Sequence, residues 1–146
     1  RLLVEPCTEA QWQTPCSSEG WSVGVTVHHI ANGYDQEGWV AEVIAAVLAG
    51  QALPAHPAEL HPDRDYNEWN AQHFAACSQD ETLALLRRNE AAALRLIESL
   101  PDEDLEKTAP ASLDGDTMSV QQVIEYLLID HAQEHLRSLR ATLERG

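Results

Sequence analysis

The chain has 146 residues, and its 24 Asp and Glu against 9 Lys and Arg give a net charge of −15 when the seven His are neutral. A protein that binds nucleic acid without sequence specificity needs Lys and Arg to displace counterions from the phosphates, and an anionic membrane surface needs the same positive charge. The composition therefore argues against nucleic acid and against a membrane as partners.

The length indicates a single folded domain over residues 1–146. The apolar share of 44% lies above the range of disordered chains, so we expect the acidic residues on the faces of ordered elements. No apolar stretch reaches the roughly 20 residues that cross a bilayer. The chain starts at Arg1 without Met or a signal sequence, so we expect the natural N-terminus, and with it the start of the first helix, to be missing.

The three cysteines are Cys7, Cys16 and Cys77, an odd number without Cys-x-x-Cys spacing. This pattern is typical neither of a disulfide framework nor of a thiolate zinc site. We interpret them as reduced thiols of a cytoplasmic protein.

Apolar residues recur every three or four positions, which predicts helices throughout and no strand. After a fragment of a first helix at 1–11, an apolar stripe predicts one long helix at about 23–50, with Ser22 as its N-cap and Gly50 at its C-terminal end. Three prolines between residues 53 and 62 then predict a long loop.

A short helix is expected at about 67–76. Ser78 and Glu81 have the spacing of a capping box, in which each side chain bonds the other's backbone amide. They predict the start of a second long helix, which runs to Leu100 and ends before Pro101.

Ser119 and Gln122 form a second capping-box pattern, which begins the last helix at about 119–144. Long helices with apolar stripes and no strand predict an all-α fold, a four-helix bundle. The longer loops after Leu48 and Leu100 allow crossover connections between its helices.

Two histidines on the last helix, His131 and His135, stand four residues apart, in one row with Leu127 and Leu139. Imidazoles at such core-facing positions need polar partners, and a shared metal ion is one candidate. With seven His in the chain, the spacing also arises by chance, so hydrogen-bonded or exposed histidines are the alternative. Ala132 stands where the zinc protease motif needs Glu, which argues against that class.

A catalytic site with one metal ion commonly has a third protein ligand. The candidates are His28, His29, His56, His61 and His73. We interpret His56 and His61, which lie among prolines, as exposed loop residues. His28 and His29 are 100° apart on their helix, so only one can face the pair, and helical phase does not choose between them.

A family resemblance makes that choice. The segment WSVGVTVHHI at 21–30 resembles the Trp-Ser-x6-His-[Leu/Ile] opening of the second helix in the DinB/YfiT-like superfamily, also called the DinB and mycothiol-dependent maleylpyruvate isomerase-like fold. The His eight residues after the Trp is a metal ligand in that family, which implies His29 here. The family's other ligands form a His-x-x-x-His pair on the last helix, which matches His131 and His135. The segment DYNEWNA at 65–71 also resembles a Trp-Asn-Ala stretch of the family.

The resemblance implies a DinB/YfiT-like bundle whose three His bind one divalent metal ion, with Zn favoured over Ni or Fe. It implies a metal-dependent S-transferase or isomerase that uses a low-molecular-weight thiol, mycothiol or bacillithiol, and a small-molecule electrophile. No residue of the chain identifies the electrophile or the catalytic groups. The alternative is a non-catalytic, stress-related metal-binding bundle, and a homodimer is left open.

Some residues near the expected site have two interpretations. Trp21 and Trp69 are interpreted as packing anchors rather than substrate platforms, and His28 as a hydrogen-bond partner of solvent or of another helix. The role of His73 is left open. Three acidic residues close to the His pair would either orient an imidazole or belong to the solvated face: Glu125, Asp130 and Glu134.

Overall fold

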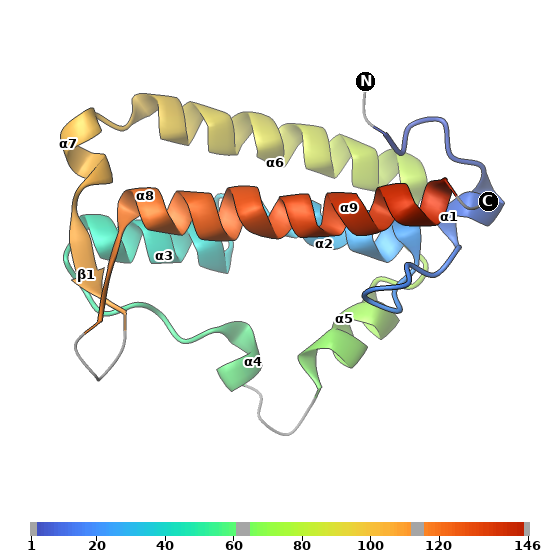
Figure 1. Ribbon diagram of the computed structural model, residues 1–146, viewed down its shortest axis with the longest axis horizontal. Coiled ribbons are helices and arrows are strands. Elements are labelled where there is room, and N and C mark those ends of the chain that lie inside the picture. Colours follow the sequence, from blue (N-terminus) through green and yellow to red (C-terminus); the bar gives the residue numbers. More distant parts are fainter. Residues whose placement is uncertain (1–2, 61–64, 112–115, 145–146) are drawn as a thin grey trace.

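A computed structural model of the protein describes residues 3–60, 65–111 and 116–144 (Figure 1). These residues are predominantly helical, as predicted. Among them, no helix is both long and apolar enough to cross a membrane. The helices are α1 (Glu9–Trp12), α2 (Val23–Gly33), α3 (Trp39–Leu48), α4 (Pro57–Leu60), α5 (Tyr66–His73), α6 (Gln79–Ser99), α7 (Asp102–Leu105), α8 (Val120–Val123), the π-helical η1 (Ile124–Asp130) and α9 (His131–Leu143).

The long helices form three rows that pack side by side (Figure 1). α2 and α3 make one row, α6 packs against α2, and the continuous helix of α8, η1 and α9 packs against both α2 and α3. The α2–α3 row and α6 run in the same direction, so the segment that carries α4 and α5 returns along the length of the molecule, which is the crossover expected after Leu48. After Leu100 the chain turns back at the same end and runs antiparallel to α6.

The single helix expected at 23–50 is wrong, because the chain leaves the helical path between Gly33 and Trp39. Oδ1 of Asp35 accepts the backbone amide of Glu37 at 3.1 Å, and the carbonyl of Asp35 accepts that of Gly38 at 3.1 Å. Such local bonds compete with the helical ladder. The apolar stripe continues through the break because both helices lie in one row (Figure 1).

The expectation of no strand is also wrong. β1 (Thr108–Pro110) pairs antiparallel with β2 (Thr117–Ser119), and Ala109 lies opposite Met118. Three-residue strands are too short for an alternating pattern to be recognised in the sequence. In the longer loop expected after Leu100, residues 112–115 lie outside the described residues.

The three predicted serine N-caps are confirmed, whereas the short helix expected at about 67–76 ends earlier, at His73. The hydroxyls of Ser22 and Ser78 accept the backbone amide three residues on, and Ser119 with Gln122 forms the complete capping box. Gly50 follows α3 with a φ of 66°, the left-handed conformation that ends many helices. The first-helix fragment contains one helical turn, α1.

The buried core has two clusters, one at each end of the bundle. One includes Trp12, Val23, Val27, Ala31, Leu83, Leu86 and Leu139, and the other Val43, Ile44, Val47, Ala109, Val120, Val123 and Leu128. Tyr34 packs against both clusters, and its hydroxyl donates to the carbonyl of Leu128 at 3.2 Å. This bond ties the end of α2 to η1.

Gly24 allows α2 to approach the buried ring of Trp12, which is 1% exposed. A Cβ at position 24 would lie 2.6 Å from Cε2 of that ring. We therefore expect Gly24→Ala to lower the free energy of unfolding by about 1–3 kcal/mol, measured by urea denaturation. Gly33→Ala is the matched control, because a Cβ there meets nothing within 4 Å; equal losses in both variants would contradict the packing argument.

Candidate metal centre

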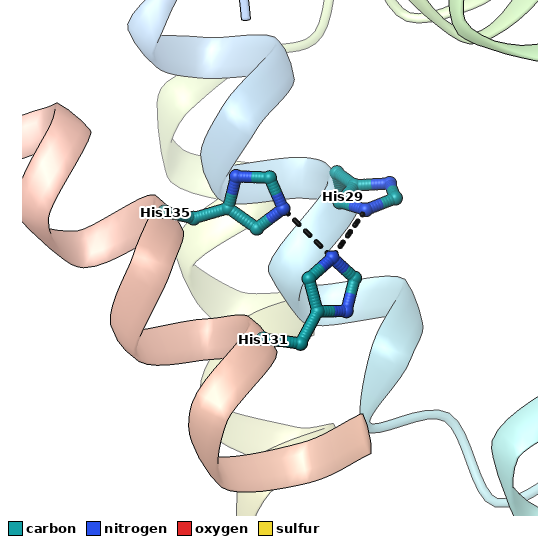
Figure 2. Close-up of side chains that lie close together, drawn as sticks. All are labelled: His29, His131 and His135. Carbon is teal, nitrogen blue, oxygen red and sulfur yellow. Dashed lines mark hydrogen bonds between the residues drawn. The ribbon is translucent and has the colours of Figure 1, made fainter. Parts of the chain in front are cut away.

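Three histidine side chains meet where α2 faces α9 (Figure 2). Nε2 of His131 lies 3.2 Å from Nε2 of His29 and 2.8 Å from Nε2 of His135. One ring nitrogen from each residue lies within 4.8 Å of the others. The structure thus brings together all three residues that the resemblance implied as ligands, from helices about a hundred residues apart.

Two of the three separations between these nitrogens fit a shared metal ion, and the third pair lies within 4.8 Å. A metal–nitrogen bond of about 2.0–2.1 Å places two ligand nitrogens roughly 2.9 Å apart at a right angle and roughly 3.4 Å apart at the tetrahedral angle. The distances of 2.8 and 3.2 Å are close to this range. Imidazole ligands suit Zn, Ni, Fe and Cu better than Mg or Ca. The three His could therefore hold a divalent transition-metal ion.

The environment favours the neutral form of two of the site's imidazoles, His29 and His131. The pKa of His29 is lowered to about 3, mainly by burial, with the neighbouring His135 and His131 contributing in the same direction. Burial also lowers the pKa of His131, where His135 acts in the same direction and the carboxylate of Glu134 opposes it. A neutral ring has a free lone pair, which metal ligation requires.

The metal-free protein should lose stability in acid through His29. Because its pKa is about 3 when folded and about 6.5 when unfolded, the unfolded chain binds more protons between these values. The contribution of His29 to the free energy of unfolding is therefore fully present above about pH 6.5. As the pH is lowered from there toward 3, this contribution falls by up to about 1.4 kcal/mol per pH unit. Urea denaturation in a chelator should show a shallower decline for His29→Gln than for the wild type; parallel declines would contradict this origin.

His135 is held from its far side by Glu19. Its Nδ1 lies 2.8 Å from Oε1 of Glu19, whose Oε2 accepts the hydroxyl of Ser138 at 2.5 Å. The side chains of His135 and Glu19 are only 12% and 11% exposed. A carboxylate that accepts the Nδ1 proton leaves the Nε2 lone pair free for a metal ion.

Sequence reasoning missed Glu19 and considered instead Glu125, Asp130 and Glu134. Glu125 accepts a hydrogen bond from Gln121, and the other two line the cleft described below. No local signal could have identified Glu19, because it lies 116 residues from its imidazole partner.

The loop before α2 positions Glu19 and Trp21. The amide of Cys16 donates to the carbonyl of Trp21 at 2.7 Å, and Gly20 adopts a φ of 74°. Trp21 packs edge-on against His29, with ring centroids 5.1 Å apart, and stacks with His135 at 6.2 Å. Trp21 is therefore a packing anchor, as predicted, and it holds two of the three imidazoles.

The remaining described histidines lie elsewhere. His28 stacks on Phe74 at a centroid distance of 3.9 Å, and its Nδ1 lies 3.3 Å from Nδ2 of Asn32, so its described hydrogen-bond partner lies on the same helix and not on another. His73 stacks on Trp69 at 4.8 Å. Neither belongs to the three-His group.

His56 is not the exposed loop residue that was expected, and it is only partly exposed. Its ring lies edge-on between Trp39 and Tyr66, at centroid distances of 4.7 and 5.5 Å, and its Nδ1 accepts the amide of Ala58. These contacts join three segments of the chain, so the proline pattern alone could not reveal them. His61 lies outside the described residues.

A cleft of about 660 Å³ is lined by two of the three histidines, His29 and His131. Further lining residues come from the α2–α3 break, from α3 to α5 and from the last helix: Asp35, Trp39, His56, Tyr66, Tyr126, Leu127, Asp130 and Glu134. Part of the last-helix wall is the π-helical η1. Such wide turns are frequent at functional sites, and the helical pattern of the sequence did not reveal this one.

Known proteins share this architecture. The family model of the DinB superfamily matches residues 1–139. A Bacillus licheniformis protein named "putative metal-dependent hydrolase" is 28% identical over 146 residues, which make up 99% of this chain and 77% of the relative. YfiT from Bacillus subtilis, described as "a probable metal-dependent hydrolase with an unusual four-helix bundle topology", is 18% identical with a TM-score of 0.69, over 97% of this chain and 76% of YfiT. This likeness confirms the predicted fold class.

Proposed function

The chain belongs to the DinB superfamily, and on that basis we propose that it is a metal-dependent enzyme whose divalent ion is held by His29, His131 and His135. The observation that carries the proposal is that the Nε2 atoms of the three histidines converge, and that two of these histidines, His29 and His131, also line a cleft. Structural metal sites are closed by four protein ligands, whereas three leave a position for water or substrate. Within the described ranges, the group of potential ligands contains these three residues.

The proposed reaction transfers a low-molecular-weight thiol to a small electrophile. A divalent ion, when bound, makes a thiol or water molecule acidic enough to lose its proton near neutral pH. In a transferase the S–H bond breaks, a carbon–sulfur bond forms, and the leaving group departs with the electrons of its own bond. In an isomerase the thiol adds to a carbon–carbon double bond without a leaving group, and its later elimination restores the double bond. The cleft of about 660 Å³ lies within the range of sites that bind drug-sized ligands.

The chain's own side chains have separate tasks in this scheme. Glu134 and Asp130 line the cleft together with His131, so their carboxylates are placed to accept the released proton. Glu19 holds His135 in the ligating tautomer. Mycothiol is the first thiol to test, because the net charge of −15 disfavours the carboxylates of bacillithiol.

Hydrolysis is the second candidate, favoured by the names of the two relatives, with water replacing the thiol in the same cleft. We favour Zn as the ion, with Ni or Fe as alternatives. The cysteines Cys7, Cys16 and Cys77 are all free thiols, which supports a reducing, cytoplasmic setting. A homodimer stays a prediction, which light scattering on the purified protein would test.

The test incubates metal-loaded protein with monochlorobimane and mycothiol, bacillithiol or no thiol, and follows the fluorescent conjugate. We expect turnover with mycothiol that falls to background in His131→Ala and persists in His28→Ala. An activated ester without thiol tests hydrolysis in the same variants. Background rates in every arm, with metal still bound, would favour the alternative of a non-catalytic metal-binding bundle.

A further inference from the structure

We propose that the cleft selects an aromatic substrate that is uncharged or cationic and discriminates against carboxylates. This inference rests on the proposed function in taking the cleft beside the three histidines as the substrate site. It extends that function by naming the chemical class of the electrophile, which the sequence left undefined.

The charges around the cleft have one sign. Its described lining includes the carboxylates of Asp35, Asp130 and Glu134 and no Lys or Arg. Asp35 comes from the break between α2 and α3, whereas Asp130 and Glu134 lie one helical turn apart on the opposite wall. Negative charge therefore lies on both sides of the space that a substrate would enter, and it repels an anion from either side.

A divalent ion at the three histidines does not reverse this balance. The imidazoles are neutral ligands, so the ion would contribute two positive charges against three carboxylates, and a nucleophile whose proton passes to one of these carboxylates would leave the sum unchanged. A carboxylate-bearing substrate could gain attraction only by ligating the ion itself, in competition with the nucleophile. The part of the substrate that lies away from the ion thus meets a net negative field.

The walls supply aromatic surface as well as charge. Trp39 and Tyr66 flank the ring of His56, and the indole N–H of Trp39 donates to the carbonyl of Pro54 at 3.2 Å, which fixes its orientation. Tyr126 lines the other wall and is 64% exposed. Aromatic rings stack with planar ligands, and their faces attract cations. Aromatic walls next to carboxylates favour a planar ring with a neutral or cationic substituent.

The experiment compares three probes that differ in charge: benzyltrimethylammonium, benzyl alcohol and phenylacetate. The readout is the indole N–H signal of Trp39 in protein with nitrogen-15-labelled Trp, which Trp39→Phe identifies. Titrations are run on metal-free and on zinc-loaded protein. We expect the cation to bind roughly tenfold more tightly than phenylacetate, with the alcohol between them, because the exposed carboxylates of the walls attract the cation and repel the anion only modestly.

Removing the wall charges should remove the preference. In the double variant Asp130→Asn/Glu134→Gln, we expect the ratio of the affinity for the cation to the affinity for phenylacetate to fall at least threefold. The control double variant Asp102→Asn/Glu103→Gln lies on the exposed α7, outside the cleft lining, and should leave this ratio unchanged. Phenylacetate binding as tightly as the cation, or equal effects of the two double variants, would overturn the proposal. Metal binding is measured separately. A loss of charge selectivity with metal still bound would contradict only this proposal, and a failure to bind metal would contradict only the proposed metal site.

Discussion

Replacing His29, His131 or His135 with Ala should abolish tight binding of the divalent ion, while His28→Ala should retain it. Zinc sites with four ligands bind with about 10–16 kcal/mol, or roughly 3 kcal/mol per ligand, so losing one ligand should weaken binding on the order of a hundredfold or more. The measurement is metal content and competition with a chromophoric chelator, on protein purified without a His-tag and without added metal. Circular dichroism checks that each variant is helical.

His28 is a matched control because it neighbours His29 in the chain but stacks on Phe74. Loss of metal in His28→Ala with retention in His29→Ala would show that the ligand assignment is wrong by one position. Ion binding to the folded state alone also raises the unfolding temperature by mass action. That gain should be lost in acid, where protons compete for the ring nitrogens, and only well below pH 6.5 because the pKa values of His29 and His131 are lowered. It should be absent from the three ligand variants.

Glu19→Gln should weaken metal affinity by about 10- to 100-fold, the usual effect of removing a carboxylate that supports a ligating histidine. Gln has nearly the same shape and can still bond Ser138 and His135, so the free energy of unfolding of the metal-free protein should change far less than the affinity. The two measurements together separate a positioning role from a purely structural one.

Glu134→Gln is the control for charge alone. Glu134 neighbours His135 in the chain, but it lines the cleft rather than holding an imidazole, so its removal should change affinity only a few-fold. An equal loss in both variants would mean that the ion responds to net charge and not to the hydrogen bond from His135.

The sequence determined the features that depend on neighbours in the chain. Helix caps such as Ser22 and Ser119 act over three residues, and helical periodicity puts His131 and His135 on one face because the backbone rises one turn in about four residues. The proline-rich loop after α3 follows in the same way from steric restriction of the backbone. The helical class and the placement of His131 and His135 on one face were therefore predictable.

The tertiary structure decided which residues join that pair. Helical phase left His28 and His29 equivalent, and the family resemblance pointed to His29. Rotation of α2 about its axis depends on packing with other helices, including the bond from Asn89 to the carbonyl of Ala31, and this rotation turns His29 toward α9.

Glu19 and His56 had no signal in the sequence for a related reason. The bond from His135 to Glu19 and the packing of His56 between Trp39 and Tyr66 connect segments that share no period or motif. The break at Asp35 was hidden because α2 and α3 continue one apolar stripe. Contacts of this kind form only when distant elements pack together and bring a buried polar group or ring next to its partners.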